Sequence, residues 1–502
     1  MNICDWIYQW SAETPGKCAL IFEGQSFTYL EVAHAVREYS ARLRRSFGIK
    51  RGDRVAYLGL NSPGFLFLIF ACARIGALIA PLNWRLAQVE LKTLVKDAEP
   101  RLLIADRSMQ AGWTDDPEFN DCEFVSMSHD CADGWKNFFA ESVNSETGTP
   151  KDCAEDPLLL VYTSGTTGAP KGALLAHNAL LANAKNSQTM HQLSAEDLSL
   201  VSLPFFHVGG LNILTTPTLF VGGTVILQRT FEPQAMLAAM MDEKPTRVPI
   251  VSAQMPPILN LPGWQEARFP LLKSVTTGAS PVSPVVYSSW QEKGVAVLQV
   301  YGATETCPIA INTNLGEELP GIGTAGRAAA GCKVKIVDDD AREVAQGQAG
   351  EILISGDNLM SSYWRNQSAT AAALRDGWYL SGDIGYQDKE GYYYIVDRKN
   401  DMIISGGENI YPAEIEALLM QHEGIAEAAV IARPDERWGE VPVAAVLCKE
   451  KHDLSENEIL TSLEGRLGRY KIPKAVVFVT NFPRNSVGKI QKFILRNSLF
   501  RE

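Results

Sequence analysis

The residues with the clearest chemistry lie in one glycine-rich stretch. Between Thr163 and Gly172 the sequence reads TSGTTGAPKG, with four hydroxyl side chains, three glycines and one lysine. Glycine lets backbone N–H groups approach an anion closely, hydroxyls donate further hydrogen bonds, and a flexible ammonium can follow a phosphate group. The stretch therefore predicts a turn that binds the phosphates of ATP.

The order of these residues differs from that of the common P-loop. A P-loop needs Gly-Lys, then Ser or Thr, then a helix, whereas Ala169 and Pro170 interrupt the sequence before Lys171. The hydrophobic residues 158–162 directly precede the stretch and have the pattern of a buried strand. A P-loop kinase or ATPase is therefore disfavoured, and so is a surface loop without function.

Composition limits the class of protein. The chain has 502 residues, 46% of them hydrophobic, and a net charge of −12 without a long Lys/Arg run, so nucleic acid is not expected as a partner. The nine cysteines form no CxxC pair, which favours free thiols and a cytoplasmic location. No signal peptide is expected. The apolar residues 65–82 contain Arg74, which disfavours a transmembrane segment and favours a buried helix followed by a strand.

The elements that must position the turn alternate between strand and helix. Strand patterns at 55–58 and 78–81 alternate with helix patterns at 63–74 and 88–97, and a similar block spans 195–300. This rhythm predicts an α/β fold of layers around mainly parallel sheets.

Three regions depart from this rhythm. Residues 107–156 have little pattern and are expected to form a surface excursion. Short strand-and-turn units after Gly321 predict a β-rich part of the main domain. A polar pentad at 397–401 precedes a fresh small α/β unit. The sequence therefore predicts two domains, 1–397 and 398–502, joined by a short hinge.

Six further motifs accompany the glycine-rich stretch. They are Pro204-Phe205-Phe206-His207, Tyr301-Gly302-Ala303-Thr304-Glu305-Thr306, YLSGD at 379–383, Asp397-Arg398, SGGEN at 405–409 and PRNSVGK at 483–489. In their order and spacing, over nearly the whole chain, they resemble the adenylate-forming (ANL) superfamily, and within it the AMP-forming acyl-CoA synthetases that act on fatty or aryl acids. The resemblance implies a large N-terminal adenylation domain of stacked α/β sheets with a β-rich subdomain, and a small, mobile α+β C-terminal domain.

The resemblance also implies a two-step reaction. The carboxylate of an apolar monocarboxylic acid would attack the α-phosphate of ATP and release pyrophosphate, and CoA would then attack the acyl-adenylate and release AMP. ATP and Mg²⁺ are the expected cofactors and CoA is the co-substrate. A carrier-protein thiol as the acceptor stays open as an alternative, and so does a homodimer. A non-catalytic ATP-binding protein is disfavoured by the intact Lys171, Glu305 and Lys489.

The residues expected by this resemblance to bind ATP or CoA form one set. They are Thr163, Ser164, Gly165, Thr166, Thr167, Gly168, Lys171, Gly278, Ala279, Ser280, Tyr301, Gly302, Ala303, Asp383, Arg398, Ser405, Gly406 and Gly407. The first seven would hold the β- and γ-phosphates, Tyr301 and the segment from Gly278 to Ser280 would adjoin adenine, Asp383 and Arg398 would clamp the ribose, and the last three would serve CoA.

The residues expected to act in catalysis are Lys489, Thr304, Glu305 and His207. Bringing a carboxylate to a triphosphate requires positive charge and hydrogen-bond donors. The resemblance implies that Glu305 recruits Mg²⁺, that Thr304 binds the α-phosphate, and that Lys489 bridges that phosphate and the substrate carboxylate. Asn400 stands where relatives often carry Lys or Asp at the hinge.

By the resemblance, the acyl pocket comprises His207, Val208, Gly209, Gly210, Asn212 and Met255. Residues 198–231 contain no acid, which disfavours an amino-acid substrate, and residues 249–260 contain no cation, which disfavours a dicarboxylate. The two glycines are interpreted as leaving room for a ring or a chain, and Met255 as suiting an apolar guest. Fatty and aryl acids stay open.

Residues 321–326 match the dinucleotide motif GxGxxG, but no strand pattern precedes them and a strand pattern rather than a helix follows. We interpret them as a turn, so an oxidoreductase is disfavoured. The seven histidines have no metal-ligand spacing.

Overall fold

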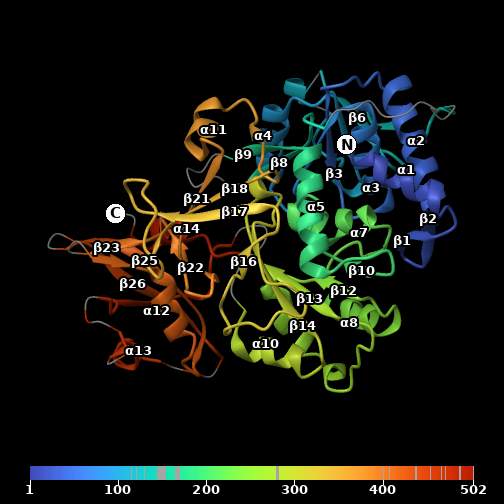
Figure 1. Ribbon diagram of the computed structural model, residues 1–502. Coiled ribbons are helices and arrows are strands. Elements are labelled where there is room, and N and C mark those ends of the chain that lie inside the picture. Colours follow the sequence, from blue (N-terminus) through green and yellow to red (C-terminus); the bar gives the residue numbers. More distant parts are fainter. Residues whose placement is uncertain are drawn as a thin grey trace. The chain divides into compact units, whose positions relative to one another are not determined.

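The computed structural model (Figure 1) describes residues 1–500 except 115, 120, 129, 144–153, 164–169, 279–281, 400, 406, 407, 436, 437, 451, 453, 465, 468, 470 and 485–487. The chain divides into two compact units, Met1–Val334 with Ile354–Tyr379 and Lys335–Leu353 with Leu380–Glu502. It passes between them within β17 (Cys332–Val337), β18 (Gly350–Gly356) and β21 (Trp378–Gln387). The expected boundary after residue 397 lies inside the second unit, and the extent of a mobile domain stays a prediction.

The first unit contains a nine-stranded sheet in the order β16-β15-β14-β13-β12-β10-β11-β1-β2. Its strands are β1 (Cys18–Phe22), β2 (Gln25–Thr28), β10 (Leu198–Val201), β11 (Thr224–Leu227), β12 (Arg247–Pro249), β13 (Ser274–Gly278), β14 (Ala296–Tyr301), β15 (Ile311–Asn312) and β16 (Arg327–Ala328). The pairs from β1 through β11, β10, β12 and β13 to β14 are all parallel. The predicted α/β layers around mainly parallel strands are therefore present.

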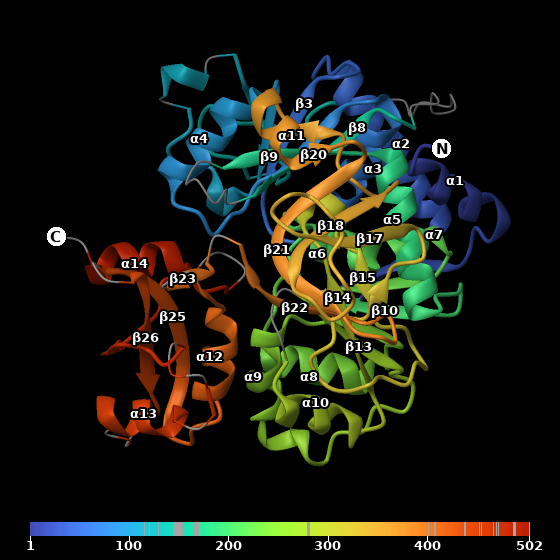
Figure 2. The ribbon, with the colours of Figure 1, turned by 60° about the vertical axis from the view of Figure 1, so that its left-hand side comes forward.

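Helices cover one face of this sheet. They are α8 (Pro233–Asp242), α9 (Met255–Leu259) and α10 (Pro284–Gln291), and Figure 2 shows α8 and α10 next to β13 and β14. Met236 on α8 and Trp290 on α10 join Val248, Val275 and Val297 of the strands in one buried cluster. Burial of such large apolar side chains is the main stabilising contribution to this layer.

The first unit also contains an eight-stranded sheet in the order β19-β9-β8-β4-β3-β5-β6-β7. Its strands are β3 (Arg54–Leu58), β4 (Leu78–Pro81), β5 (Leu102–Ala105), β6 (Glu123–Ser126), β7 (Lys136–Asn137), β8 (Pro157–Thr163), β9 (Lys171–Ala176) and β19 (Ser362–Tyr363). Strands β8 and β9 form an antiparallel hairpin, and β19 adds to its outer edge. The glycine-rich stretch is the connection within this hairpin.

The remaining helices of the first unit are α1 (Cys4–Glu13), α2 (Tyr29–Arg45), α3 (Pro63–Ile75), α4 (Gln88–Ala98), α5 (His177–His191), α6 (Val208–Gly210), α7 (Thr216–Phe220) and α11 (Gln367–Ala373). Helix α3 shows how local sequence sets its ends. The Ser62 side chain accepts a hydrogen bond from the Phe65 N–H, Pro63 occupies the first turn, and Gly76 ends the helix with φ of 73°. No described helix is long and apolar enough to cross a membrane.

The expectation of a surface excursion at 107–156 is wrong for much of that segment. It contributes β6 and β7 to the eight-stranded sheet, and Trp113, Phe119 and Trp135 are buried. Trp113 packs edge-to-face on Phe119 at a ring-centroid distance of 5.6 Å. These aromatic side chains extend the core beneath α4. The GxGxxG residues 321–326, by contrast, contain no helix, as predicted.

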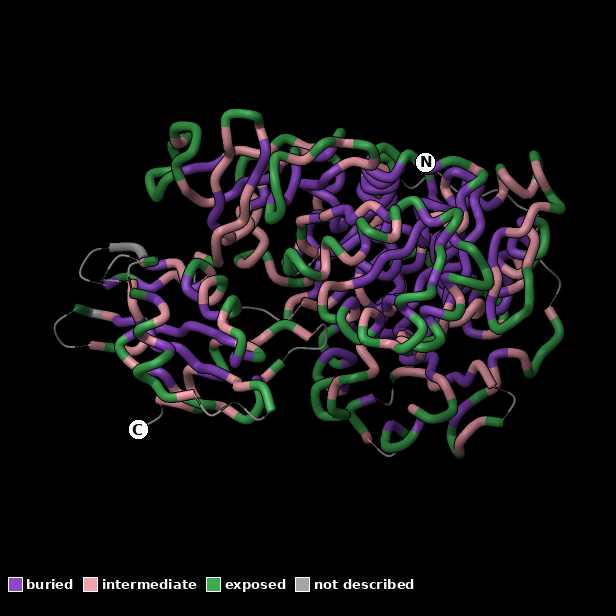
Figure 3. The backbone as a smooth tube through the Cα atoms, turned by 90° about the horizontal axis from the view of Figure 1, so that it is seen from below, coloured by how far each residue is buried: buried purple, intermediate pink, exposed green. Residues whose placement is uncertain are grey.

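The second unit is built around a sheet in the order β24-β23-β26-β25, with β27 beside β26. Its elements are β22 (Tyr393–Arg398), β23 (Ile403–Ser405), β24 (Glu408–Ile410), α12 (Pro412–Leu419), β25 (Ile425–Asp435), β26 (Gly439–Cys448), α13 (Glu456–Leu463), β27 (Val476–Phe478) and α14 (Lys492–Phe500). Figure 3 shows that the buried residues gather in the interior of each unit.

Candidate active site

Three predicted motifs follow the carboxyl ends of neighbouring parallel strands. Residues 204–207 come shortly after β10, Gly278 ends β13 and Tyr301 ends β14. Because β10, β12, β13 and β14 are adjacent and parallel, these residues lie along one edge of the nine-stranded sheet. Ligands of α/β proteins bind outside such an edge, so the first unit carries a candidate site there.

The glycine-rich stretch connects two strands rather than a strand and a helix. Thr163 and Lys171 lie opposite each other at the end of the β8–β9 hairpin, and the Thr163 hydroxyl donates to the Lys171 carbonyl at 3.4 Å. Residues 164–169, and with them Ser164, Gly165, Thr166, Thr167 and Gly168, lie outside the described residues. The hairpin agrees with the exclusion of a P-loop, which leads into a helix.

Glu305 is buried and held by a residue that the sequence did not single out. The Tyr363 hydroxyl donates a hydrogen bond to Glu305 Oε1 at 2.5 Å, and Lys171 Nζ lies 5.4 Å from the centre of the Tyr363 ring. Tyr363 therefore brings together the expected metal-binding carboxylate and the lysine of the glycine-rich stretch. Hard carboxylate oxygen suits Mg²⁺, and no described residue donates to Oε2, so Glu305 fits the predicted metal role.

The turn that carries Glu305 is closely packed. A Cβ atom at Gly302 would lie 1.8 Å from the Pro308 carbonyl oxygen, so only glycine fits there. Asn358 Nδ2 donates to the Thr306 carbonyl at 2.7 Å. Thr304 is buried, and the Ala303 carbonyl at the start of the same turn accepts the Thr306 N–H at 3.0 Å. The predicted residues Tyr301 to Glu305 therefore sit on a fixed turn.

His207 is a neutral imidazole. Burial lowers its pKa to about 4, and its Nδ1 accepts a hydrogen bond from the Gly209 N–H at 3.0 Å. Since Nδ1 is the acceptor, Nε2 carries the ring proton. His207 can therefore donate a hydrogen bond from Nε2 without adding positive charge at neutral pH.

The interpretation of Gly209 and Gly210 as room for the acyl group is not supported by their surroundings. A Cβ at Gly210 would lie 2.2 Å from the Pro204 carbonyl oxygen, and one at Gly209 would lie 3.1 Å from His207 Nδ1. Gly210 is therefore required for close packing of the chain on itself, and the space beside Gly209 is taken by the imidazole.

The other expected pocket residues are buried. Val208 belongs to α6, and Met255 packs in the hydrophobic cluster beneath α8 to α10. Asn212 lies in a π-helical turn, Leu211–Thr215, a distortion frequent at functional sites. Its Oδ1 accepts from Thr216 at 3.3 Å, and its buried Nδ2 has no partner among the described residues.

Phe206, the residue before His207, belongs to an aromatic pair. Phe206 packs edge-to-face against Trp84 with ring centroids 6.5 Å apart. The Arg85 guanidinium lies 5.0 Å from the Trp84 ring and 5.8 Å from the Phe206 ring. The sequence did not assign Trp84 or Arg85 to the site.

The expected ribose clamp lies in the second unit. Asp383 on β21 and Arg398 on β22 are paired across the strands, with Arg398 Nε 3.3 Å from Asp383 Oδ1. Neighbouring Asp397 instead accepts the N–H groups of Arg398 and Ala413, at 2.7 and 2.9 Å. Asp397 therefore anchors the start of α12, and its role at a hinge stays a prediction.

Lys489 lies in the same unit and shares its charged surroundings with this clamp. A large part of the residue is exposed. Its pKa is nevertheless lowered, first by the protein around the ammonium and then by the positive charge of Arg398, while Asp383 and Asp401 oppose the shift. Arg484 braces the turn by donating to the Gly488 carbonyl at 2.9 Å and pairing with Glu427.

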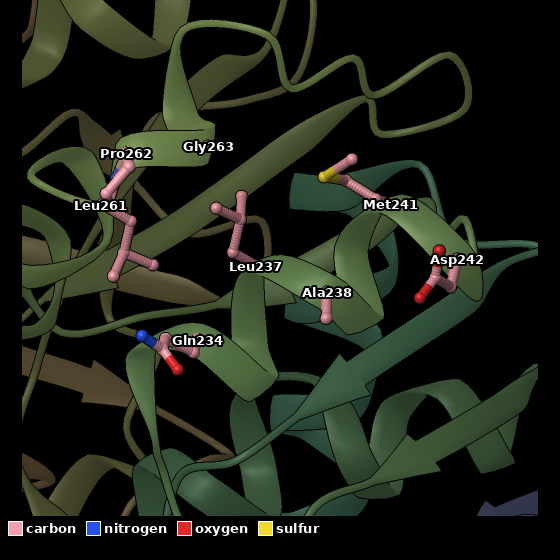
Figure 4. Close-up of a pocket in the computed structure, with 8 residues that line it drawn as sticks. All are labelled: Gln234, Leu237, Ala238, Met241, Asp242, Leu261, Pro262 and Gly263. Carbon is pink, nitrogen blue, oxygen red and sulfur yellow. The ribbon is translucent and has the colours of Figure 1, made fainter.

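Several expected residues cannot be placed. Ala279, Ser280, Gly406, Gly407 and Asn400 lie outside the described residues, whereas Ser405 is buried at the end of β23. A shallow pocket of about 290 Å³ between α8 and the turn at 261–263 is shown in Figure 4, and no expected site residue lines it. In the described part of the chain, no group of three or more His, Cys, Asp or Glu side chains is placed to hold a metal ion.

Comparison with known proteins identifies the family. The AMP-binding enzyme family matches residues 7–364, and the AMP-binding enzyme C-terminal domain matches residues 414–489. Indoleacetate–CoA ligase of Aromatoleum aromaticum is 44% identical over 100% of this chain and 99% of its own length. Feruloyl-CoA synthase of an Amycolatopsis species is 37% identical over 97% of each chain.

A solved structure agrees with these sequence relatives. O-succinylbenzoate coenzyme A synthetase (MenE) of Bacillus subtilis, in complex with ATP and a magnesium ion, superposes with a TM-score of 0.88, at 29% identity over 98% of this chain and 99% of that chain. The chain belongs to the AMP-binding enzyme family. The predicted fold class, the adenylate-forming acid–thiol ligase class, and ATP, Mg²⁺ and CoA as cofactors and co-substrate are confirmed.

Proposed function

We propose that this enzyme converts an aryl-bearing monocarboxylic acid into its CoA thioester through an acyl-adenylate. The pair formed by Trp84 and Phe206, the residue before His207, carries the choice of an aryl acid. Aromatic rings bind other rings favourably in edge-to-face or offset geometry. The two relatives named for indoleacetate and ferulate, both of which carry an aromatic ring, support the same choice.

The described residues suggest how the first step proceeds. Lys171, at the end of the glycine-rich stretch, would hold the departing phosphates, and Glu305 would hold Mg²⁺, which supplies positive charge to the triphosphate when bound. Lys489 would bridge the substrate carboxylate and the α-phosphate. Lys489 would thereby act on the α-phosphate side, and Lys171 on the pyrophosphate side, of the P–O bond that breaks.

Neutral His207 suits a carboxylic acid substrate. Its Nε2–H can donate one hydrogen bond to a carboxylate oxygen, and its lowered pKa keeps it uncharged through the neutral range. A neutral donor orients the carboxylate without adding a second positive charge to that of Lys489. His207 is therefore proposed to orient the acid before it attacks ATP.

We also propose the thiol acceptor and the cellular location. The thiol acceptor is CoA rather than a carrier protein, in line with the relatives named as CoA ligases. The location is cytoplasmic, in line with the eight described cysteines, which form no disulfide.

Pyrophosphate release and thioester formation from ATP test the proposal. The substrates are arylacetates, cinnamates, benzoates and straight-chain fatty acids, each with CoA, with a carrier protein bearing a phosphopantetheine thiol, and without a thiol. We expect the highest kcat/KM with an aryl acid and CoA. A preference for straight-chain acids would overturn the aryl choice, and thioester formation only on the carrier protein would overturn CoA as acceptor.

A pair of variants sharpens this test. Trp84→Leu should lower kcat/KM for aryl acids about tenfold, because an aromatic contact contributes on the order of 1 kcal/mol beyond buried area. Phe27→Leu is the control, since Phe27 forms a similar edge-to-face pair with Phe67, at 5.7 Å, away from these motifs. Equal effects of the two variants would contradict a role of Trp84 in acid binding.

A further inference from the structure

We propose that Tyr363 is a positioning residue for the metal–nucleotide end of the active site, acting through Glu305 and Lys171. The inference depends on Glu305 holding Mg²⁺, which is part of the proposed function. Neither the motifs of the sequence nor the family match assigns a role to Tyr363.

The hydroxyl of Tyr363 fixes the carboxylate of Glu305. Their hydrogen bond, 2.5 Å from Oη to Oε1, joins two residues that are 8% and 7% exposed. Hydrogen bonds to ionised acceptors are stronger than neutral ones. One such bond on Oε1 sets the plane of the carboxylate and leaves Oε2 for a metal ion. Carboxylates that bind metals are commonly oriented by a hydrogen bond of this kind.

The ring of Tyr363 supports Lys171. The ammonium lies 5.4 Å from the ring centre, within the range of a cation–π interaction. This contact orients the Lys171 side chain and leaves its charge intact, whereas a carboxylate partner would neutralise that charge. One tyrosine thus orients both an acidic and a basic side chain on which phosphate binding is proposed to depend.

The backbone holds Tyr363 firmly in this place. β19 pairs with β9 so that Tyr363 lies opposite Ala173. The next residue, Trp364, donates its N–H to the Gly172 carbonyl at 2.7 Å, and Met360 donates its N–H to the Glu305 carbonyl at 2.7 Å. The segment 360–364 therefore joins the strand of Lys171 to the turn of Glu305.

Calorimetric binding of nucleotide provides the test. The titrants are Mg·ATP and, in the presence of EDTA, metal-free ATP, and the proteins are the wild type, Tyr363→Phe and Glu305→Gln. Tyr363→Phe keeps the ring beneath Lys171 and loses only the hydroxyl. We expect it to weaken Mg·ATP binding roughly 10- to 100-fold, as the loss of a residue that orients a metal ligand typically does, and to change the affinity for metal-free ATP little.

Tyr57→Phe is the matched control. The Tyr57 hydroxyl is also buried and donates to a carboxylate oxygen, Asp106 Oδ1, at 3.1 Å. Loss of the Tyr57 hydroxyl should change the stability of the protein but not its affinity for Mg·ATP or for metal-free ATP. Tyr363→Leu, which also removes the ring, should weaken metal-free ATP binding as well, because Lys171 loses its support.

The outcomes separate the inference from its premise. If Glu305→Gln weakens Mg·ATP binding and Tyr363→Phe does not, the role of Tyr363 is wrong while Glu305 keeps its role. If neither variant changes the response to Mg²⁺, the metal role of Glu305 is wrong, and the inference fails with it. If Tyr363→Phe does not fold, as judged by thermal unfolding, Tyr363→His replaces it. Tyr363→His places a different hydrogen-bond donor near Glu305. The inference would be overturned if this variant bound Mg·ATP as tightly as the wild type while its affinity for metal-free ATP was weakened.

Discussion

Asp383 and Arg398 occupy opposite positions on two antiparallel strands, and Arg398 Nε lies 3.3 Å from Asp383 Oδ1. The pair is held by the hairpin itself, so a carboxylate and a guanidinium are oriented together before any ligand binds. Because a carboxylate only accepts hydrogen bonds, Asp383 is suited to the two hydroxyls of a ribose.

Replacing Asp383 by Asn should therefore weaken selection for the ribose 2′-hydroxyl. We expect the wild type to use ATP better than 2′-deoxy-ATP by about tenfold in kcat/KM, and the variant to lose most of this difference. Asp388→Asn is the control, because Asp388 accepts the N–H groups of Glu390 and Tyr392 at its own turn. Unchanged discrimination in Asp383→Asn would contradict the ribose role.

Lys489→Ala should separate the two half-reactions. We expect acyl-adenylate formation to fall roughly 10²- to 10³-fold or more, since a cation that stabilises developing charge is lost, while a supplied acyl-adenylate is still converted to thioester. Pyrophosphate release and thioester formation measure the two steps. Lys492→Ala is the comparison, because Lys492 pairs with Glu416 at 2.8 Å and should affect both steps together. An equal loss of both steps in Lys489→Ala would refute the assignment.

Acid should destabilise the protein through three histidines whose pKa values are lowered. Burial lowers the pKa of His177, His191 and His207 to about 4 each, below the ordinary value near 6.5. Between these values the unfolded chain binds protons that the folded chain does not, so the free energy of unfolding falls as the pH drops from 6.5 towards 4.

Urea unfolding at pH 7 and pH 5 measures this loss. His191 Nδ1 lies 2.9 Å from the Ser187 carbonyl oxygen and must donate to it, so Nε2 accepts from the Thr276 hydroxyl at 2.8 Å. His191→Gln should lower stability at both pH values because it disturbs these bonds, but it should make the stability difference between pH 7 and pH 5 smaller by the contribution of one histidine. If the stability difference between pH 7 and pH 5 is the same in the variant and the wild type, His191 does not contribute to the pH dependence of stability.

Gly210→Ala should destabilise the protein, since the added methyl group would lie 2.2 Å from the Pro204 carbonyl oxygen. We expect a loss of about 1–3 kcal/mol, typical of overpacking. Gly321→Ala is the control, because nothing lies within 4 Å of its Cβ position. If Gly210→Ala is stable and instead changes the preferred acid, the glycine would border the acyl pocket after all.

Sequence reasoning worked best where local signals set a structure. Ser62, Pro63 and Gly76 determine both ends of α3, and the expected strand at 78–81 coincides with β4. The prediction for residues 107–156 was wrong because the large apolar residues of this segment, Trp113, Phe119 and Trp135, do not recur at the spacing of a strand or of a helix. Their burial depends on packing against α4 and the sheet, which no local pattern encodes.

The site shows the same division. The motifs predicted roles for Lys171, Glu305 and Asp383 without a structure, because their types and order resemble those of the family. Tyr363 could not be found in this way, since it lies in a two-residue strand with no periodicity of its own. The sequence also cannot show in which direction a missing side chain points, which is why Gly210 was interpreted as open space.

The edge position of β19 has a consequence for biosynthesis. Ser361 hydrogen-bonds to Leu174, 187 residues earlier in the chain, and β19 is the only described strand that covers the outer side of β9. A nascent chain that has not yet released this segment from the ribosome leaves β9 as an open edge, to which strands of other chains can add. The edge of β9 is therefore covered only after residues 361–363, near the end of the first unit, have been synthesised and have folded onto it.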